Sequence, residues 1–259
     1  MRSRHGLEDR RVLITGASGG IGVALAQAFA DQDARLWLVD RDADRLHALA
    51  AALPGARATT CDLGSDSAVQ ALATEVQAQW GRVDALVNNA GLEYPTPIGD
   101  PATDAMARWS GLIDNNVVSM VRLTRALLPC LPRGSCVINQ SSIWGRVGVA
   151  DFSAYVASKH AVIGLTRSLA LELGGRGVRV NAVCPGWVRT DAAMRSLAAM
   201  AVAQGRTEAE VERDILALQA VPVMLTPEDL APTFLFLASD DAAPITGQAI
   251  VVSHGEVMA

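Results

Sequence analysis

The residues best placed to perform chemistry are a tyrosine and a lysine one helical turn apart. Tyr155 and Lys159 lie in the run Ala154–Lys159, and apolar residues at helical spacing follow from Ala161 to Leu173. The two side chains are therefore expected on one face of a helix. An ammonium group one turn from a phenol stabilises the phenolate and lowers its pKa from about 10 toward neutrality. Such a phenol can give or take the proton of an alcohol, although the pair alone also fits one turn of an ordinary helix.

A glycine-rich turn near the start of the chain predicts a dinucleotide site. It separates a short apolar run, Arg11–Ile14, from an alanine-rich helical stretch, Val23–Ala30. Strand, glycine turn and helix in this order can hold a pyrophosphate at the helix N-terminus. Gly16 allows the tight turn, Gly20 lets the backbone approach the phosphates, and Gly22 lets the helix pack closely on the strand. A flexible loop is the alternative interpretation.

An aspartate at the end of the second apolar run indicates which dinucleotide binds. Asp40 follows Leu36–Val39 and lies about twenty residues after Gly22. A carboxylate there accepts hydrogen bonds from the adenosine ribose and repels the 2′-phosphate of NADP. We therefore expect NAD as the cofactor, although the neighbouring Arg41 would favour a phosphate. Asp40 is also a candidate N-cap for the helix that follows.

Composition and charge exclude several classes of protein. The chain has 259 residues, half of them hydrophobic, which is enough for one α/β domain with a substantial core. A net charge of −5 argues against a nucleic-acid partner. No apolar run reaches the ~18–20 residues that span a bilayer, and the first ten residues lack the apolar segment of a signal peptide. We therefore expect a soluble cytoplasmic protein that does not bind membranes.

The cysteines and histidines do not predict a metal site. The four cysteines are scattered and form no Cys-x-x-Cys pair, and the four histidines cluster with neither cysteines nor carboxylates. His160 directly follows Lys159, but successive helical residues point about 100° apart. We therefore expect His160 to face away from the tyrosine–lysine pair, and we expect no metal.

Short apolar runs alternate with helical patterns along the whole chain. The expected strands are 12–14, 36–39, 57–60, 83–87, 136–139, 178–183 and 249–252. The expected helices are 20–31, 42–52, 66–80, 103–128, 153–174 and 227–238. This alternation predicts a doubly wound α/β fold, a parallel sheet with helices on both faces. No linker, repeat or low-complexity segment divides the chain, so residues 1–259 are expected to form a single domain.

One stretch, at about 191–219, breaks the alternation with helical sequence and no strand. Thr207 and Glu210 form a Thr-x-x-Glu capping box, and Val211, Ile215 and Leu218 follow at the spacing of one helical face. We predict a helical substrate lid, because a site that must exclude water needs a cover. A surface hairpin with a packing role alone is the alternative.

Taken together, these motifs resemble the short-chain dehydrogenase/reductase family over nearly the whole chain. Thr15–Gly22 matches the family's cofactor turn, Asn88–Gly91 its motif after the fourth strand, and Pro185–Thr190 its nicotinamide segment. The residues that match the catalytic positions are Asn116, Ser142, Tyr155 and Lys159. The resemblance implies a Rossmann-type seven-stranded sheet in the order 3-2-1-4-5-6-7, a nicotinamide dinucleotide cofactor and a homotetramer.

The resemblance also assigns a role to each catalytic match. Tyr155 would be the general acid/base, and Lys159 would keep the phenol acidic and bind the nicotinamide ribose. Ser142 would hold the substrate oxygen, and Asn116 would hold water in a proton relay from Lys159 to solvent. The implied cofactor-binding residues are Gly16, Ser18, Gly20, Ile21, Gly22, Asp40, Arg41, Asp62, Leu63, Asn89, Ala90, Gly91, Tyr155, Lys159, Pro185, Gly186, Val188 and Thr190.

Three further residues have an implied role outside catalysis. Asp62 would meet the adenine amine, or would instead cap the helix that starts near Asp66. Thr190 would bind the nicotinamide carboxamide. Asn88 would bridge neighbouring strands through its amide.

The substrate side resembles the bacterial 3-hydroxybutyrate dehydrogenases only in part. The C-terminal third looks much like theirs, but Glu93, Trp144 and Phe152 stand where those enzymes hold a carboxylate with glutamine, histidine and lysine. An anionic substrate would lose its hydration there without compensation, unless Arg146 or Arg195 reached in. We therefore expect a neutral secondary alcohol or ketone as the small-molecule partner. The expected substrate-binding residues are Glu93, Ser142, Trp144, Phe152, Tyr155, Trp187 and Met194.

Two other functions remain open at this point. The first is a hydroxy-acid dehydrogenase of the 3-hydroxybutyrate type. The second is a non-catalytic dinucleotide-binding sensor or scaffold, against which the complete set of four catalytic matches argues. The tail Ser253-His254-Gly255 replaces the Asp-Gly-Gly that relatives often carry, so its conformation is left open.

Overall fold

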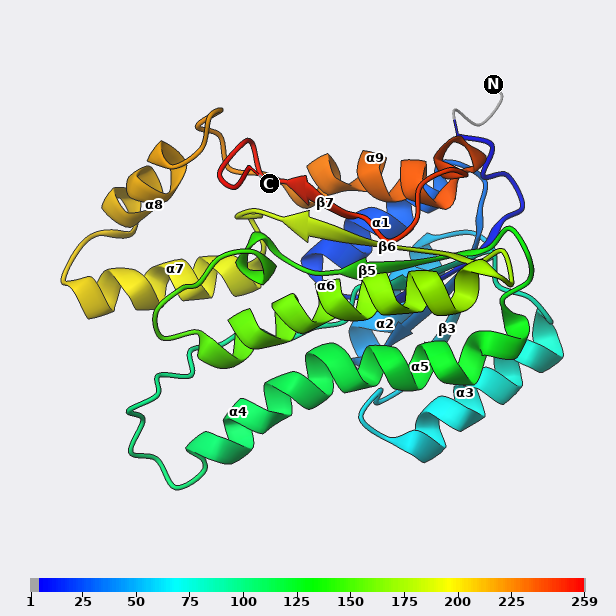
Figure 1. Cartoon of the computed structure of the whole chain (residues 1–259), viewed down its shortest axis with the longest axis horizontal. Coiled ribbons are helices and arrows are strands. Elements are labelled where there is room, and N and C mark those ends of the chain that lie inside the picture. Colours follow the sequence, from blue (N-terminus) through cyan, green and yellow to red (C-terminus); the bar gives the residue numbers. More distant parts are fainter. Residues whose placement is uncertain (1–4, 259) are drawn as a thin grey trace.

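Within residues 5–258, which the computed structural model describes, seven strands form one parallel sheet (Figure 1). The first four residues of the N-terminal segment considered above lie outside this range. The strands are β1 (Arg11–Thr15), β2 (Arg35–Asp40), β3 (Arg57–Thr60), β4 (Ala85–Asn88), β5 (Cys136–Gln140), β6 (Arg179–Pro185) and β7 (Ala249–Val252). Their order is β3-β2-β1-β4-β5-β6-β7, which confirms the Rossmann-type arrangement that was expected.

Helices cover both faces of the sheet. They are α1 (Gly20–Ala30), α2 (Ala43–Ala52), α3 (Asp66–Gln79), α4 (Ala105–Ile113), α5 (Ser119–Leu127), α6 (Ser153–Gly174), α7 (Asp191–Gln204), α8 (Glu208–Ala217) and α9 (Pro227–Ala238). Successive strand residues point to opposite faces. Val12 and Ile14 of β1 therefore pack with α1, α2 and α9, and Leu13 packs with α3, α5 and α6. Both faces of β1 are buried, so its sequence is a continuous apolar run.

The helix expected over 103–128 is interrupted by a π turn. It consists of α4, a π-helical turn over Asp114–Val118, and α5. Asn116 lies within this turn and is buried. A π turn inserts an extra residue into the helical repeat and is frequent at functional sites. The apolar periodicity of the sequence did not reveal it.

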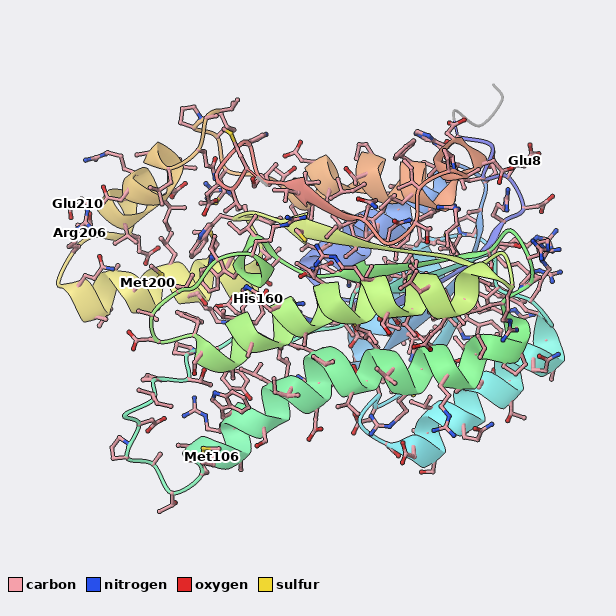
Figure 2. All side chains as sticks on the ribbon, in the orientation of Figure 1. Glu8, Met106, His160, Met200, Arg206 and Glu210 are labelled. Atoms are coloured by element: carbon pink, nitrogen blue, oxygen red, sulfur yellow. The ribbon has the colours of Figure 1, made fainter. Side chains whose placement is uncertain are left out.

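The helical pair α7–α8 occupies the predicted lid region. Its capping box at Thr207 and Glu210 is present, and Figure 2 shows Arg206 and Glu210 at the end of the pair farthest from the sheet. Val211 and Ile215 are buried in a small apolar cluster of the pair's own, separate from the two cores of the sheet. Leu218 was expected on the same face, but it is 68% exposed because the helix ends at Ala217.

The C-terminal tail contacts the segment before α7 and the segment after α8. A Cβ atom on Gly186 would lie 2.9 Å from the Cβ of Ser253, so the tail packs directly on the segment before α7. His254 has a left-handed φ of 51°. Its Nδ1 lies 2.7 Å from the carbonyl oxygen of Val223, and its own carbonyl accepts a hydrogen bond from Val221 N at 3.0 Å. The unusual tail sequence therefore holds the segment that follows α8.

The described residues contain neither a candidate membrane-spanning helix nor a candidate group of metal-binding side chains. In the part of the chain that the structure describes, no helix combines the length and apolar character needed to cross a membrane. Over the same residues, no three His, Cys, Asp or Glu side chains are grouped so that they could hold a metal ion. The cysteines are buried free thiols.

The sequence over 103–128 and 153–174 carries more apolar residues than one face of the sheet needs, so both helices are expected to contribute to a subunit interface. These residues are Leu123, Leu127, Ala161, Leu165 and Leu169. Leu123 and Leu127 are fully buried in the core between the sheet and α3, α5 and α6. They are therefore not available to a subunit interface, contrary to expectation. On the outside of the same helices, Val121 is 40% exposed and Leu171 is 86% exposed. Ala161 is also exposed, and Leu165 and Leu169 are partly exposed, so apolar surface remains on the outer face of α6.

We expect a homotetramer in which the outer faces of α5 and α6 pair across an interface. Light scattering at micromolar concentration should therefore give the mass of four chains. Leu171→Glu should lower that mass without unfolding the protein, because the side chain is exposed in the single chain. A monomeric wild-type protein would contradict this prediction.

Candidate active site

A cavity of about 480 Å³ opens where the parallel strands end. This carboxyl edge is where doubly wound sheets bind ligands. The predicted residues that line it are Gly16, Ser18, Gly20, Ile21, Gly22, Asp40, Arg41, Asp62, Leu63, Asn89, Ala90, Gly91, Glu93, Ser142, Trp144, Tyr155, Lys159, Pro185, Gly186, Trp187, Val188 and Thr190. Asn116, Phe152 and Met194 belong to the predicted set but do not line the cavity.

The glycine turn after β1 presents backbone donors to the cavity. Helix α1 begins at Gly20 without a side-chain cap, so its first N–H groups remain available to a ligand. Gly16 has a φ of 61°. A Cβ atom on Gly22 would lie 2.1 Å from the carbonyl oxygen of Gly16, so the turn can close only with glycine at position 22. Asn89 Nδ2 donates to the carbonyls of Thr15 at 2.9 Å and Gly16 at 3.0 Å, which ties the turn to the end of β4.

Backbone donors fix the carboxylate of Asp40 at the end of β2. It accepts hydrogen bonds from Ser18 N at 2.9 Å, Arg41 N at 2.7 Å and Asp42 N at 3.3 Å. Asp42, rather than Asp40, caps α2 by accepting from Arg45 N at 3.1 Å. The alternative role of Asp40 as a helix cap therefore does not apply, and its charge stays beside the glycine turn.

These features fit a nicotinamide dinucleotide. The free N–H groups of α1 suit phosphate oxygens, and the Asp40 carboxylate suits ribose hydroxyls. Asn89 lines the cavity, and its Oδ1 is enclosed without a hydrogen-bond partner among the residues that the structure describes. Asp62 Oδ1 accepts from Gly64 N at 2.9 Å, and Ser65 caps α3 instead. Asp62 thus remains on the cavity wall, as the resemblance implied.

Tyr155, Lys159 and Ser142 meet at the cavity as predicted. Helix α6 carries Tyr155 and Lys159 one turn apart, with Lys159 Nζ 5.5 Å from the centre of the Tyr155 ring. Lys159 Nζ donates to the carbonyl of Gln140 at 3.0 Å. Ser142 Oγ accepts a hydrogen bond from Trp144 N at 3.1 Å, and the Ser142 hydroxyl acts on the phenol of Tyr155 by lowering its pKa. The serine and the phenol can therefore bind the same substrate oxygen.

Burial controls the proton affinities at this centre. It raises the pKa of Tyr155 well above the ordinary value; the charge of Glu93 adds to this, and the hydrogen bond to Ser142 opposes it. Burial lowers the pKa of Lys159 to about 8, against the opposing charges of Cys184 and Glu93. The expectation that Lys159 brings the phenol pKa close to neutrality is therefore not met. A protonated Tyr155 can donate its proton to a carbonyl oxygen.

Asn116 positions the loop after β4 instead of facing the cavity. Its Nδ2 donates to the Leu92 carbonyl at 2.9 Å and to Ser158 Oγ at 3.0 Å, and its Oδ1 accepts from Leu92 N at 2.8 Å. Both hydrogens of the side-chain amide are thus engaged by protein groups, and its oxygen accepts one backbone hydrogen bond. Ser158, which the sequence analysis did not single out, links this amide to α6.

Glu93 connects the loop after β4 to α7. Its Oε1 accepts a hydrogen bond from Ser196 Oγ at 2.8 Å. Burial raises the pKa of Glu93, while the hydrogen bond from Ser196 and the charges of Arg195 and Lys159 oppose that rise. Arg195 lines the cavity. Arg146, the other arginine considered for a substrate carboxylate, donates instead to the carbonyl of Ala249 at 2.5 Å, under β7.

An aromatic cluster forms the wall beside Tyr155. Between ring centroids, Trp144 lies 4.9 Å from Phe152, 5.8 Å from Tyr155 and 6.1 Å from Trp187. All three pairs are edge to face. Phe152 and Met194 were both expected to bind the substrate, but neither lines the cavity. Phe152 is buried and packs on Trp144, and Met194 packs on the apolar cluster between α7 and α8.

Comparisons with known proteins identify the family. Residues 16–256 match the family model described as enoyl-(acyl carrier protein) reductase. The chain is 37% identical to a putative ketoacyl reductase of the monensin polyketide synthase from Streptomyces virginiae, covering 95% of this chain and 97% of the relative. It is 34% identical to a D-beta-hydroxybutyrate dehydrogenase from Cupriavidus necator, covering 93% and 95%. The crystal structure of a variant of actinorhodin polyketide ketoreductase with NADPH matches with a TM-score of 0.88 at 30% identity, covering 96% and 97%.

The chain therefore belongs to the short-chain dehydrogenase/reductase family. It is an NAD(P)-dependent oxidoreductase that acts on hydroxyl and keto groups.

Replacing Glu93 should move the pH profile of the reaction. Its charge raises the pKa of both Tyr155 and Lys159; Cys184 also raises the pKa of Lys159, and the positive charge of Arg195 acts on Glu93 itself. Removing a negative charge makes proton loss easier at each group. In Glu93→Gln, the midpoint of kcat/KM for alcohol oxidation should thus move to lower pH, by about half a unit or more. Glu93→Asp keeps the charge and is the matched control; an unchanged or higher midpoint in Glu93→Gln would refute this coupling.

Proposed function

We propose that this protein is an NAD-dependent oxidoreductase that interconverts a neutral secondary alcohol and its ketone. The observation that carries the proposal is the convergence of Ser142, Tyr155 and Lys159 on one cavity that also holds the glycine turn and Asp40. A phenol and a hydroxyl are thereby available to one substrate oxygen, beside a site suited to a dinucleotide.

The chain's own residues handle the substrate oxygen and its proton. When bound, the dinucleotide supplies the hydride acceptor for oxidation and the hydride donor for reduction. Ser142 orients the oxygen, and Tyr155 donates its proton to the carbonyl in reduction and removes it from the alcohol in oxidation. A positioned acid/base of this kind contributes about 10²–10⁴-fold to the rate. The ammonium of Lys159 stabilises negative charge on the phenol in the oxidative direction.

The preference for NAD rests on Asp40. Its carboxylate is held by three backbone N–H groups, so it cannot readily turn away from a 2′-phosphate. Arg41 and Arg45 also line this end of the cavity. Either arginine could accept a phosphate if the carboxylate were absent, so the fixed charge of Asp40 decides the preference.

The polarity of the substrate side supports a neutral substrate. A carboxylate would meet the charge of Glu93 and the ring of Trp144, and Arg146 is committed elsewhere. We further propose that α7–α8 is a lid, since Ser196 on α7 bonds to Glu93 across the cavity wall. A hydroxy acid is the second candidate, because Arg195 lines the cavity and could bind a carboxylate.

An assay of the purified protein tests the proposal. With NAD, it should oxidise neutral secondary alcohols better than 3-hydroxybutyrate. Tyr155→Phe should lower kcat by roughly 10²-fold or more, while the protein still binds NADH with a measurable fluorescence change. Better turnover of 3-hydroxybutyrate would instead favour the hydroxy-acid reading, with Arg195 as its carboxylate partner. No turnover of any alcohol, with intact NADH binding, would favour a sensor.

Cofactor choice is tested at Asp40. Asp40→Ser removes the charge that repels a 2′-phosphate and leaves Arg41 and Arg45 in place. Relative kcat/KM for NADP over NAD should rise by about tenfold or more, the scale of one charged hydrogen bond. Asp44→Ser, in the first turn of α2 and outside the cavity lining, is the control and should leave the ratio close to that of the wild type. A wild-type enzyme that already prefers NADP would overturn the assignment.

A further inference from the structure

Glu93 places a carboxylate in the wall of the substrate cavity with one oxygen uncommitted. Oε1 accepts the hydrogen bond from Ser196. Among the residues that the structure describes, no hydrogen bond to Oε2 is found, and Oε2 is not one of the fully enclosed unpartnered atoms. Because Glu93 lines the cavity, this second oxygen is open to a ligand inside it.

The carboxylate is also close to the reacting centre. The loop that carries it passes Lys159 at Gly91, where an added Cβ atom would lie 3.4 Å from Lys159 Nζ. The charge of Glu93 is felt by both Tyr155 and Lys159. Glu93, Ser142 and Tyr155 line the same cavity, so a substrate whose carbinol oxygen lies on Ser142 and Tyr155 can extend toward Glu93.

We propose that Glu93 accepts a hydrogen bond from a second hydroxyl group next to the reacting carbinol, so that the enzyme acts on vicinal diols and the matching hydroxyketones. This inference rests on the proposed function and names its substrate class. A carboxylate is an acceptor without a donor, so it recognises a substrate that supplies the hydrogen. A site built in this way rejects an analogue that lacks the donor, because the buried acceptor is then left unpaired.

The charges around Glu93 favour a hydroxyl over an ammonium group as that donor. The positive charges of Arg195 and Lys159 already act on the carboxylate. A cationic substrate would add a third positive charge beside them, and like charges repel most strongly where water is excluded. A neutral hydroxyl satisfies the free oxygen without this repulsion. The aromatic wall of Trp144 and Trp187 leaves the other side of the carbinol to an apolar group.

Four compounds with one phenyl ring test the proposal on the wild-type enzyme. The diol is 1-phenylethane-1,2-diol, and the others replace its second hydroxyl by hydrogen, methoxy or amine: 1-phenylethanol, 2-methoxy-1-phenylethanol and 2-amino-1-phenylethanol. With NAD, kcat/KM for the diol should exceed that for the methoxy ether and for 1-phenylethanol by about tenfold or more. The ether replaces the donor hydrogen by a methyl group, and 1-phenylethanol, which is smaller than the diol, controls for that added bulk. The amine should also fall below the diol.

Two variants separate recognition from a merely structural role. Glu93→Leu removes the acceptor and should lower the diol-to-ether ratio by about tenfold or more. Ser196→Ala also breaks the bond between Glu93 and α7 but leaves the acceptor in place. Its ratio should therefore stay within about threefold of the wild type, a difference well below that of one charged hydrogen bond.

The outcomes distinguish this inference from the function on which it rests. If 1-phenylethanol or the ether is oxidised as well as the diol, the oxidoreductase proposal stands and the diol proposal is wrong. A preference for the amine would assign Glu93 to an ammonium group instead. If no compound in the series or any other neutral alcohol is turned over, both proposals fail. The wild-type comparison needs no variant, so a Glu93→Leu protein that does not fold leaves the test intact.

Discussion

The burial of the Lys159 ammonium is the constraint on which the rest of the site depends. An ammonium group taken out of water is costly unless nearby acceptors replace its hydration, and here the side chain is 2% exposed. The carbonyl of Gln140 at the end of β5 accepts its hydrogen bond. The surrounding backbone must also come very close: an added Cβ atom on Gly145 would lie 2.7 Å from the Lys159 carbonyl oxygen. Glycine is therefore required where the chain leaves Ser142.

The same constraint explains the polar network behind the cavity. Ser158, next to Lys159, donates to the carbonyl of Tyr155 at 2.7 Å and accepts from Asn116. Asn116 in turn holds both backbone groups of Leu92. The π turn is what brings that amide to the junction of α5, α6 and the loop after β4. The two catalytic side chains and the loop that carries Glu93 are thus held by one set of buried hydrogen bonds, which a helix of regular repeat would not assemble.

Local patterns in the sequence were sufficient for the alternation of strands and helices, while the order of the strands came from the family resemblance. Apolar runs and turn signals gave the seven strands and most helix ends, because these depend on neighbours within a few residues. The π turn was not predicted, because it adds one residue without changing the apolar pattern. Ser196 was not predicted either, because its partner Glu93 is 103 residues away in the chain. Phe152 and Met194 were expected on the cavity wall because sequence position gives proximity but not the direction of a side chain.

The lid proposed for α7–α8 follows from where its apolar contacts lie. Its buried residues form their own cluster with Trp187, so the pair carries a small core that does not depend on the two cores of the sheet. The pair contacts the loop after β4 through the hydrogen bond from Ser196 to Glu93. The segment that follows α8 is held by His254, whose ring contacts the carbonyl of Val223. A unit of this kind can change its distance from the sheet while both sheet cores stay closed. Such a movement would break the hydrogen bond between Ser196 and Glu93, so under the two proposals above one residue would serve both substrate recognition and closure.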